Sequence, residues 1–458
     1  MVGVIGNNMK KSKQNVVKIS DYINTRYRDY SIYTNNERAI PSIIDGFKPV
    51  QRKIIYAAIK ECSKDFVKLS ALGGVLAKVS AYHHGNVSAE NAIIKMAQDF
   101  NQNVPLLDYE GTFGTRPVPD AGAARYIFVK IGDNFGNIFK DNDILPQSLD
   151  KDDHPEPLYY LPIIPTVLLN GAKGMAVGFA VNILPRSIVG LTESCINYVS
   201  KGKVLEVMPQ LESFTGTFEK VNEKKFLCKG VLKHERLNIY RIHELPLSFV
   251  HEKYVTHLDS LIEKGIIKKY VDDTSDTFDF QIHASRGVTQ EQLENELKLT
   301  ESITENISLI EDFHQTDTDD MDNIKIKSYD SIEEVIKTFC DFRIGFYNTR
   351  IQYNLDKLNE SIILKKAKID FINDVLNNKI NIRNVTRKQL QDVMVNKGYD
   401  IDLVTKIISI PVYTMTKDNI DKLNREIDSH VKDIEWWNKQ TAKKLYLKDL
   451  RDLLKEYK

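Results

Sequence analysis

The chain has 458 residues, which is too long for one ordinary domain, so we expect two to four domains. Hydrophobic residues make up 42% of it and aromatic residues 9%, which suffices for real cores. The formal net charge is +0, but residues 1–130 carry 18 Lys and Arg against 11 Asp and Glu. A basic N-terminal third is compatible with a polyanionic partner, and equally with a solvated surface of mixed charge.

The cysteines and the apolar runs exclude several classes of protein. The four cysteines are far apart and form no Cys-x-x-Cys pair, which argues against a zinc site and against a disulfide framework. No apolar run reaches the roughly 18 residues of a membrane span, and the N-terminus lacks an apolar signal segment. We therefore expect a protein of the reducing cytoplasm with no membrane partner.

The basic region begins with a polar tail over residues 1–17 and turns helical from Ile19. Asp45-Gly46 is a turn signal, and Pro49 suits the first turn of a helix. A second helix is predicted near 68–79, and a third follows a short break, with Asn86 or Ser88 as its cap. A glycine-punctuated, hairpin-like segment spans 105–116. Three helices followed by a hairpin make a winged helix, whose third helix would enter a DNA groove.

A tyrosine stands at the mouth of the next predicted strand. Four small residues, Ala121 to Ala124, precede Arg125 and Tyr126, and Ile127 opens an apolar strand. A tyrosine beside a fixed cation can act as a nucleophile, although its ordinary pKa of ~10 means that it needs help to ionise. The chain has 21 tyrosines, and on its own such a residue is more commonly part of a core or a sheet edge.

Six short motifs follow one another along the chain. In chain order they are Asp45–Lys53, Ala81–Gly85, Ala97-Gln98 with Phe100, Gly111–Arg116, Ala123–Tyr126 and Tyr160–Gly171. Their order resembles the breakage–reunion subunit of type IIA DNA topoisomerases. Within that family, the short length is closest to the separate medium subunit of tailed-phage type II enzymes. His83-His84 and the Gln-Arg-Lys triplet are closer to the eukaryotic enzymes than to bacterial gyrase.

The resemblance implies that Tyr126 attacks a DNA phosphodiester and forms a 5′-phosphotyrosyl bond, so that resealing needs no nucleotide. Because negative charge gathers on the phosphoryl oxygens, cations must face them, and the matching positions are Arg125, Arg52 and His84. Outside the motif context, His84 would be a capping or packing histidine and Arg52 an exposed helix charge. Residues expected to bind DNA are Arg38, Lys48, Lys53, His83, Ser88 and Arg116.

The resemblance also implies an apolar wedge that enters a base step and bends the DNA. The isoleucine before Pro165 matches it, so we expect Ile164 to be that wedge. The alternative is that Ile164 is a core residue of an apolar strand.

The family uses Mg²⁺ held by a Toprim domain, and this chain offers no convincing site for it. The acidic runs 150–153 and 317–322 are typical of solvated loops. Gly171–Gly178 is glycine-rich but lacks the Gly-Lys-[Ser/Thr] ending of a phosphate loop. We therefore expect Mg²⁺ and ATP to be bound by a partner subunit with ATPase and Toprim domains, and the isolated chain neither to cleave DNA nor to hydrolyse ATP.

A long helix is predicted from Ser331 to about Leu376, since apolar residues recur every seven positions, which gives ~70 Å of helix. A second apolar stripe, capped by Thr416, would form an antiparallel coiled coil with it. In the family, the globule between such helices dimerises as an exit gate, so we expect a homodimer through it. The alternative is a rigid spacer without a dimer contact.

The expected fold is therefore α+β and multidomain, with a winged-helix DNA-gate domain, a mixed α/β tower domain and a long coiled coil that ends in a dimerisation globule. No wrapping domain follows the coiled coil, which favours relaxation and decatenation over supercoiling. The competing function is a non-catalytic DNA-bending protein. The expected regions are an N-terminal arm (1–28), winged helix (29–140), tower (141–330), first coiled-coil helix (331–378), globule (379–415), and second coiled-coil and C-terminal helices (416–458).

Overall fold

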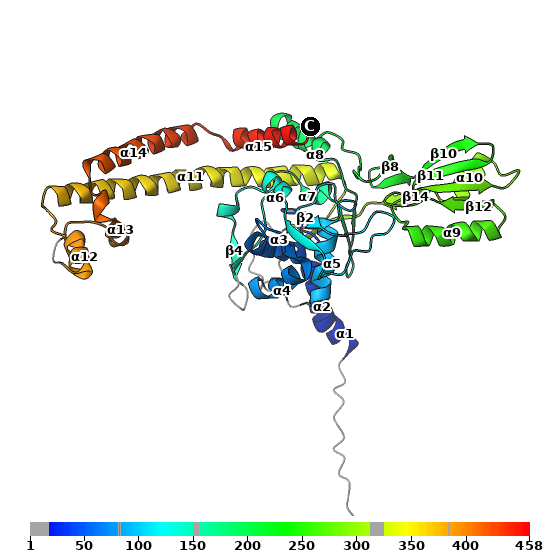
Figure 1. The fold of residues 1–458 in the computed structure, drawn as a ribbon, viewed down its shortest axis with the longest axis horizontal. Helices are drawn as coiled ribbons and strands as arrows, with labels where there is room; N and C mark the ends of the chain where they lie inside the picture. The colour runs from blue at the N-terminus through cyan, green and yellow to red at the C-terminus, as the bar shows by residue number, and fades with distance from the viewer. Residues whose placement is uncertain (1–17, 81, 83, 150–154, 312–324, 383–384) are drawn as a thin grey trace, which may run out of the picture.

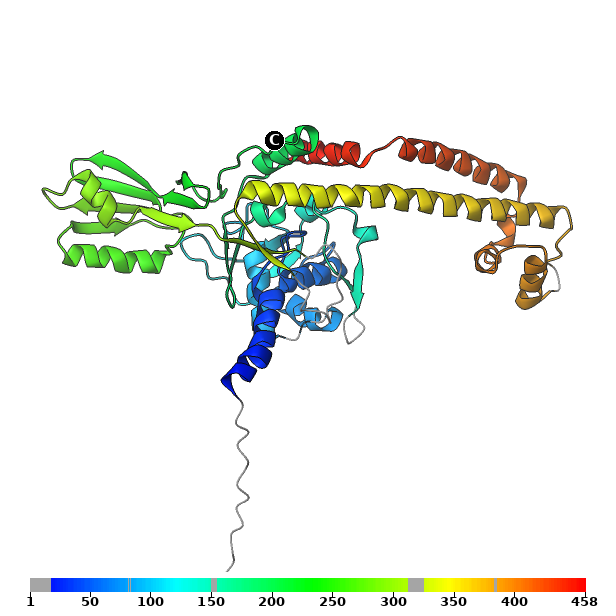
Figure 2. The same cartoon turned by 180° about the vertical axis from the view of Figure 1, so that it is seen from behind.

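The structure is a computed structural model and describes residues 18–80, 82, 84–149, 155–311, 325–382 and 385–458. Figure 1 shows an elongated molecule with a central body, an α/β region at one end and a helical arm at the other. The same three parts are seen from behind in Figure 2. No helix among these residues combines the length and apolarity needed to cross a bilayer.

A helical run that projects from the body opens the described chain (Figure 1). Its last turn is docked by Asn35, whose side-chain amide donates to the Val177 carbonyl at 3.1 Å and accepts from the Val177 N–H at 3.0 Å. The run alternates between α-helical and π-helical turns, in the order α1 (Ile19–Tyr22), η1 (Ile23–Tyr27), α2 (Arg28–Thr34) and η2 (Asn35–Ala39).

Three helices and a small antiparallel sheet follow. Pro49 opens the first helix, as predicted, because that position needs no backbone N–H donor. The third helix begins at Asn86 with Gly85 at its N-cap, so the prediction that Asn86 or Ser88 is the cap is wrong by one or more residues. The helices are α3 (Pro49–Glu61), α4 (Leu69–Val79) and α5 (Asn86–Ala97), and the sheet, in the order β1-β3-β2, comprises β1 (Val67–Lys68), β2 (Leu107–Glu110) and β3 (Phe128–Ile131).

The rest of the body is built from short elements that continue the same hydrophobic core. That core reaches from Ala39 to Leu453 along the chain, so segments far apart in sequence pack together. These elements are α6 (Asp133–Ile138), η3 (Asn142–Ile144), β4 (Gln147–Leu149), β5 (Pro155–Pro157), α7 (Thr166–Leu169), β6 (Ala172–Met175), β7 (Ala180–Ile183), α8 (Ile188–Lys201), β15 (Ile307–Ile310) and β16 (Ile326–Tyr329).

The α/β region has cores of its own, centred on residues such as Ile242, Tyr254 and Phe280. Two antiparallel sheets run in the orders β10-β11-β13-β12 and β14-β9-β8. Its elements are β8 (Thr217–Asn222), β9 (Lys225–Lys229), β10 (Val231–Arg236), β11 (Ile239–Glu244), α9 (His251–Glu263), β12 (Ile267–Asp272), β13 (Phe280–Ala284), α10 (Gln290–Glu296) and β14 (Thr300–Thr304).

These cores divide the chain differently from the expected boundaries. The predicted tower region, 141–330, is not one unit, because buried residues between 159 and 207 and between 307 and 329 belong to the core of the body. Buried residues between 211 and 299 form the separate cores. The sequence pattern did not predict this division, because the alternation of apolar residues indicates a strand but not the core against which the strand packs.

The arm is a pair of antiparallel helices with a small globule at its tip. The long helix predicted from Ser331 is confirmed, and the Ser331 hydroxyl caps it by accepting from the Glu334 N–H at 3.3 Å. The predicted cap at Thr416 is also confirmed. The elements are α11 (Ile332–Leu376), α12 (Arg387–Asn396), α13 (Ile401–Ile407), η5 (Val412–Thr414), α14 (Lys417–Asn438) and α15 (Ala442–Glu456).

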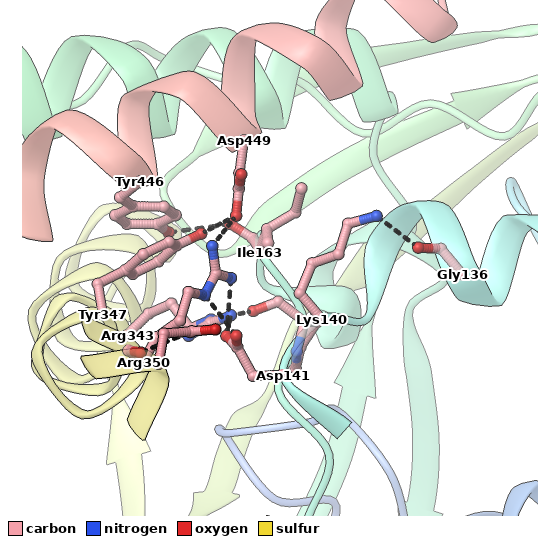
Figure 3. A network of polar contacts seen from close by, with 11 residues as sticks. Gly136, Lys140, Asp141, Ile163, Arg343, Tyr347, Arg350, Tyr446 and Asp449 are labelled. Carbon is pink, nitrogen blue, oxygen red and sulfur yellow. Dashed lines mark hydrogen bonds and ion pairs between the residues drawn. The ribbon is translucent and has the colours of Figure 1, made fainter. Parts of the chain in front are cut away.

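A buried polar network fastens the arm to the body (Figure 3). Asp141 accepts from Arg343 of α11 at 2.5 Å and pairs with both Nε and Nη2 of Arg350, which lies further along α11. Arg350 also donates to Asp449 of α15 at 2.7 Å, and the Tyr347 hydroxyl donates to the same carboxylate at 2.8 Å. Two helices and one loop of the body are thereby held by a single set of charges.

Candidate active site

Tyr126 lies at the end of the long loop between β2 and β3. Only Ile127 separates it from the first residue of β3. Its side chain is 68% exposed, whereas that of Ile127 is 2% exposed. The alternation that starts β3 therefore buries Ile127 and turns Tyr126 outward. The predicted position of the tyrosine at the mouth of a strand agrees with the structure.

The loop is fixed on both sides of Tyr126. The Ser70 N–H of α4 donates to the Ala124 carbonyl at 3.1 Å, and the Leu69 N–H donates to the Ile127 carbonyl at 3.0 Å. Earlier in the loop, the Gln98 amide donates to the carbonyls of Phe113 and Pro119 at 2.7 and 2.9 Å. Gln98, which stands in one of the motifs that carry the resemblance, therefore positions the loop from the end of α5.

Glycine is required at two places in this loop. Gly111 and Gly114 have φ values of +100° and +82°, which side chains rarely adopt. A Cβ on Gly114 would also lie 2.7 Å from the backbone of Pro119. The motif Gly111–Arg116 therefore has a structural cause, since it folds the loop back on itself before Tyr126.

Arg125 is the cation that contacts the tyrosine. Its guanidinium lies over the Tyr126 ring, 4.7 Å from the ring centroid, and both residues are exposed. A charge over the ring is an attractive cation–π contact. Arg125 can therefore bind an incoming phosphate beside the tyrosine hydroxyl while it stays close to the ring.

His84, which lies just before the N-cap of α5, and Arg38, near the end of η2, come together. The Arg38 Nη2 lies 3.3 Å from the His84 Nδ1, and the Tyr33 hydroxyl lies 3.5 Å from the Nε2. Arg38 also lies over the Tyr33 ring at 5.8 Å. Two residues that were predicted to face DNA, 46 positions apart in sequence, are thus direct neighbours.

Arg52 is not a free surface charge. Its Nε and Nη2 donate to the Asp45 carboxylate at 2.7 and 3.1 Å, and Asp45 is fully buried. Burial lowers the pKa of Arg52, but the charge and hydrogen bond of Asp45 outweigh it and raise the pKa above its ordinary value. Lys53 is similarly paired with Glu156. Both motif cations are therefore neutralised by carboxylates, and their catalytic and DNA-binding roles stay predictions.

Lys48 lies at the base of the hairpin formed by β6 and β7. Its ammonium donates to the Lys173 carbonyl at 2.7 Å, and burial, with a smaller effect from Lys95, lowers its pKa. The hairpin presents Met175, which is 90% exposed, on this side of the body. The sequence analysis did not predict this exposed apolar side chain, although a methionine inside the glycine-rich run 171–178 was a visible signal for it.

Two predicted DNA contacts are wrong in this structure. Ile164 is fully buried in the core of the body, so it cannot enter a base step unless its segment unfolds. Arg116 donates to the Leu245 carbonyl at 2.6 Å and pairs with Glu244 at 3.2 Å, between the rings of Phe214 and Phe278. It joins the tyrosine loop to the α/β region instead of facing solvent.

The other predicted residues are only partly informative. Ser88 is exposed on the first turn of α5, where a DNA backbone could reach it. His83 and both acidic runs, 150–153 and 317–322, lie outside the described residues. Within the described ranges, no three His, Cys, Asp or Glu side chains gather in a way that could hold a metal ion.

Comparison with known proteins assigns the chain to a family. The sequence model of the DNA gyrase/topoisomerase IV A-subunit family matches residues 38–453. The chain belongs to this family. It is 34% identical to the DNA topoisomerase medium subunit of Enterobacteria phage T4 over 428 residues, which cover 93% of the chain and 96% of the phage protein.

Longer members of the family are similar to this chain over part of their length. The chain is 33% identical to the DNA topoisomerase 2 of Invertebrate iridescent virus 6 and 31% identical to the mitochondrial DNA topoisomerase 2 of Dictyostelium discoideum. Each alignment covers 95% of the chain. The chain spans 39% and 35% of their lengths. The crystal structure of the Plasmodium falciparum topoisomerase II DNA-binding, cleavage and re-ligation domain superposes with a TM-score of 0.85 at 28% identity, covering 95% of this chain and 64% of that one. The mixed α/β fold is therefore that of a topoisomerase II cleavage region.

Proposed function

We propose that this chain is the DNA cleavage and religation subunit of an ATP-dependent type II DNA topoisomerase, with Tyr126 as its nucleophile. The observation that carries this is an exposed tyrosine, on a loop fixed at both ends, beneath the Arg125 guanidinium. The Tyr126 oxygen forms a bond to a backbone phosphorus as the bond to the 3′ oxygen breaks. The tyrosine proton is lost and the 3′ oxygen leaves as a hydroxyl. Religation reverses these steps, so no nucleotide is consumed in resealing.

The charges around the tyrosine support the same chemistry. Arg125, whose guanidinium lies over the Tyr126 ring, would bind the phosphoryl oxygens of the link to Tyr126. Arg38 and His84 form a second cationic group that would hold the neighbouring backbone. Arg52 acts through Asp45, since their pair fixes the start of α3 below this surface.

The DNA surface includes α3 to α5 and the sheet β1-β3-β2, which together have the composition of a winged helix. In place of Ile164, we propose Met175 as the apolar wedge, because it is the exposed apolar side chain on the hairpin beside Lys48. An unbranched, flexible thioether can slide between bases at a cost of a few kcal/mol for unstacking.

The arm is proposed to be an antiparallel coiled coil whose tip forms a dimer. The globule packs around Met394, Val404 and Ile407, yet it leaves Ile401, Val412 and Tyr413 largely exposed. Exposed apolar side chains at the end of a 45-residue helix suit contact with the tip of a second copy. The double-strand break would then lie between two copies of Tyr126.

A partner subunit is proposed to bind ATP and Mg²⁺. The phage relative is named a medium subunit, and the viral relative is a single chain of which this chain matches 39%. The remaining length of that relative is where such domains would lie. Bound Mg²⁺ would supply positive charge beside the phosphate, and the described part of this chain offers no cluster of ligands for it. A cytoplasmic, DNA-associated location also stays a prediction.

The competing function, a non-catalytic DNA-bending protein, explains fewer of the features of the tyrosine loop. It gives no role to an exposed Tyr126 and Arg125 on a loop that Gln98 and α4 hold in place. The relatives at 31–34% identity are named topoisomerases. The family therefore favours the enzyme.

The test is a covalent protein–DNA adduct. The chain is co-expressed with an ATPase and Toprim partner and mixed with supercoiled plasmid and Mg²⁺. The mixture is denatured rapidly with detergent and digested, and the peptides are analysed by mass spectrometry. Nucleotide attached to Tyr126 establishes the cleavage subunit. Tight DNA binding by a folded protein without any adduct would instead support the DNA-bending protein.

A further inference from the structure

A row of cations lies along the exposed face of α15, on a part of the chain that the cleavage chemistry does not use. The row consists of Lys444, Lys448, Arg451 and Lys455, all exposed. Their spacing of four, three and four residues places them one above another on a single helix face. At 1.5 Å per residue, the row is roughly 16 Å long. We call it the α15 stripe.

The helix that carries the stripe cannot rotate. Its opposite face buries Leu445, Tyr446, Leu450 and Leu453 against the body. The Tyr446 hydroxyl donates to the Ile163 carbonyl at 2.9 Å, which fixes the helix along its axis. The stripe is therefore a rigid line of charge, which loses little entropy when a ligand binds.

The stripe has little internal compensation. Lys455 lies 3.5 Å from Asp452, and both side chains are largely exposed. Lys444, Lys448 and Arg451 make no ion pair with any of the residues that the structure describes. Like charges one turn apart repel each other, so the fold bears a small cost that a polyanion would remove.

A hollow of about 460 Å³ lies beside the stripe, where α14 turns into α15. Trp436, 46% exposed, and Gln440 line it together with the four stripe residues, Leu445 and one carboxylate, that of Asp452. An aromatic wall next to a row of cations suits the sugar–phosphate edge of a nucleic acid, since the ring covers the apolar sugar and the cations bind the phosphates.

The position of the stripe separates it from the tyrosine site. In both views, α15 and α8 lie on one side of α11, whereas α3 and α4 lie on the other (Figures 1 and 2). A straight duplex that rests on the tyrosine side of the body does not also pass along α15. The stripe is thus placed for a different stretch of duplex.

We propose that the α15 stripe and its hollow bind the phosphate backbone of a second DNA segment, without sequence preference. DNA is chosen over other polyanions on the strength of the proposed function, because a topoisomerase acts on two segments of duplex. Binding there would keep a second segment close to the enzyme while the first is held at Tyr126.

The chain contains its own reporter for this surface. Its only two tryptophans are Trp436 and Trp437, so intrinsic tryptophan fluorescence reports on the hollow. The experiment titrates the full chain with a duplex of about 30 base pairs at several salt concentrations. A labelled duplex is followed by anisotropy in parallel, to measure total DNA binding.

The test variant carries Lys444→Glu, Lys448→Glu and Arg451→Glu. The matched control carries Lys417→Glu, Lys422→Glu and Arg425→Glu, which changes the same residue types at exposed positions of α14. We expect the fluorescence change of the wild type to require at least tenfold more DNA in the test variant and to persist in the control. The salt slope should fall by about 2 to 3 when three phosphate contacts are lost.

The outcomes separate this inference from the proposed function. No fluorescence change in the wild type at low salt, or an equal loss in both variants, would overturn it. The inference would also be overturned if a polyglutamate peptide produced the fluorescence change and duplex DNA failed to displace it. The stripe would then bind an acidic protein and not DNA. The Tyr126 adduct, measured in the same variants, should be unchanged. If no variant forms the adduct but the fluorescence result holds, the proposed function fails and the second DNA site remains.

Discussion

Two regions of this molecule use arginine in opposite ways. At the tyrosine loop, Arg125 is exposed and its guanidinium lies over the Tyr126 ring. At the junction of arm and body, Arg343 is fully buried and shares Asp141 with Arg350. The first guanidinium can still accept an anion, whereas the other two already hold one.

The difference shows what separates a binding charge from a structural one. A cation in solvent keeps its hydration until a phosphate replaces it, so it is available for function. A buried cation needs its carboxylate at all times, because removing one partner leaves an uncompensated charge. Variants in the first region should therefore change chemistry without changing stability, and variants in the second should do the reverse.

The largest effect is expected for Tyr126→Phe. The covalent complex should fall to background, because the attacking oxygen is gone. Stability and DNA affinity should stay near wild type, since the side chain is 68% exposed. Gel separation of detergent-trapped complexes measures the first quantity, and thermal unfolding and anisotropy measure the others. Residual covalent complex in this variant would exclude Tyr126 as the nucleophile.

Arg343→Ala is the corresponding change at the junction. It removes one of the two arginine partners of Asp141, leaves the buried Pro162 carbonyl without this donor and opens a cavity, so we expect a loss of about 2–5 kcal/mol in the free energy of unfolding. Chemical denaturation followed by circular dichroism measures it. The control is Lys337→Ala on the same helix, whose ion pair with Glu333 is exposed and should be worth at most about 1 kcal/mol. Equal losses in the two variants would remove the distinction between the regions.

Ile164 and Met175 extend the comparison to apolar residues. Ile164→Ala should cost about 2–5 kcal/mol of stability, since it opens a cavity in the core. Met175→Ala should cost less than about 0.5 kcal/mol but should weaken DNA bending, measured by energy transfer between dyes at the ends of a duplex. Leu237→Ala, 87% exposed on another hairpin, is the control that should change neither. Unchanged bending in Met175→Ala would leave the wedge unassigned.

Local features of this fold could be predicted from the sequence, because they depend on neighbours. Thr416 and Ser331 cap helices by bonds to residues three positions on, and the seven-residue pattern fixes the course of α11. The strand after Tyr126 follows from alternation, which also turns the tyrosine outward.

The pairing of charges could not be predicted in this way. Arg116 meets Glu244 from a part of the chain more than 100 residues away, so no spacing rule distinguishes it from a DNA-binding arginine. Arg52 is only seven residues from Asp45, but the pair forms because Asp45 is buried and held by the backbone of Tyr160 and Phe47. The motif Asp45–Lys53 predicts cations in this part of the chain, and tertiary contacts decide which of them stay exposed.

The smallest effect is a pair of opposite pH dependences, one from Asp141 at the junction and one from Glu37 of η2, which lies near Lys53 and Arg52. Burial alone would raise the pKa of Asp141, but the hydrogen bonds and charges of Arg350 and Arg343 outweigh it and hold the pKa below 3.8. Its contribution to stability is therefore complete above pH 3.8 and is lost as the pH falls through the folded-state pKa. Burial raises the pKa of Glu37 above 4.5, despite nearby Lys53 and Arg52, so its contribution is complete below pH 4.5 and is lost as the pH rises through the folded-state pKa.

Thermal unfolding between about pH 3 and 7 should accordingly show a weaker loss of stability in acid for Asp141→Asn, and a smaller decline of stability toward neutral pH for Glu37→Gln. Asn tolerates the positive φ of 66° at position 141, so the first variant changes charge with little backbone strain. Slopes of the same sign in the two variants would mean that the junction and the surroundings of Arg52 do not differ in how they hold their carboxylates.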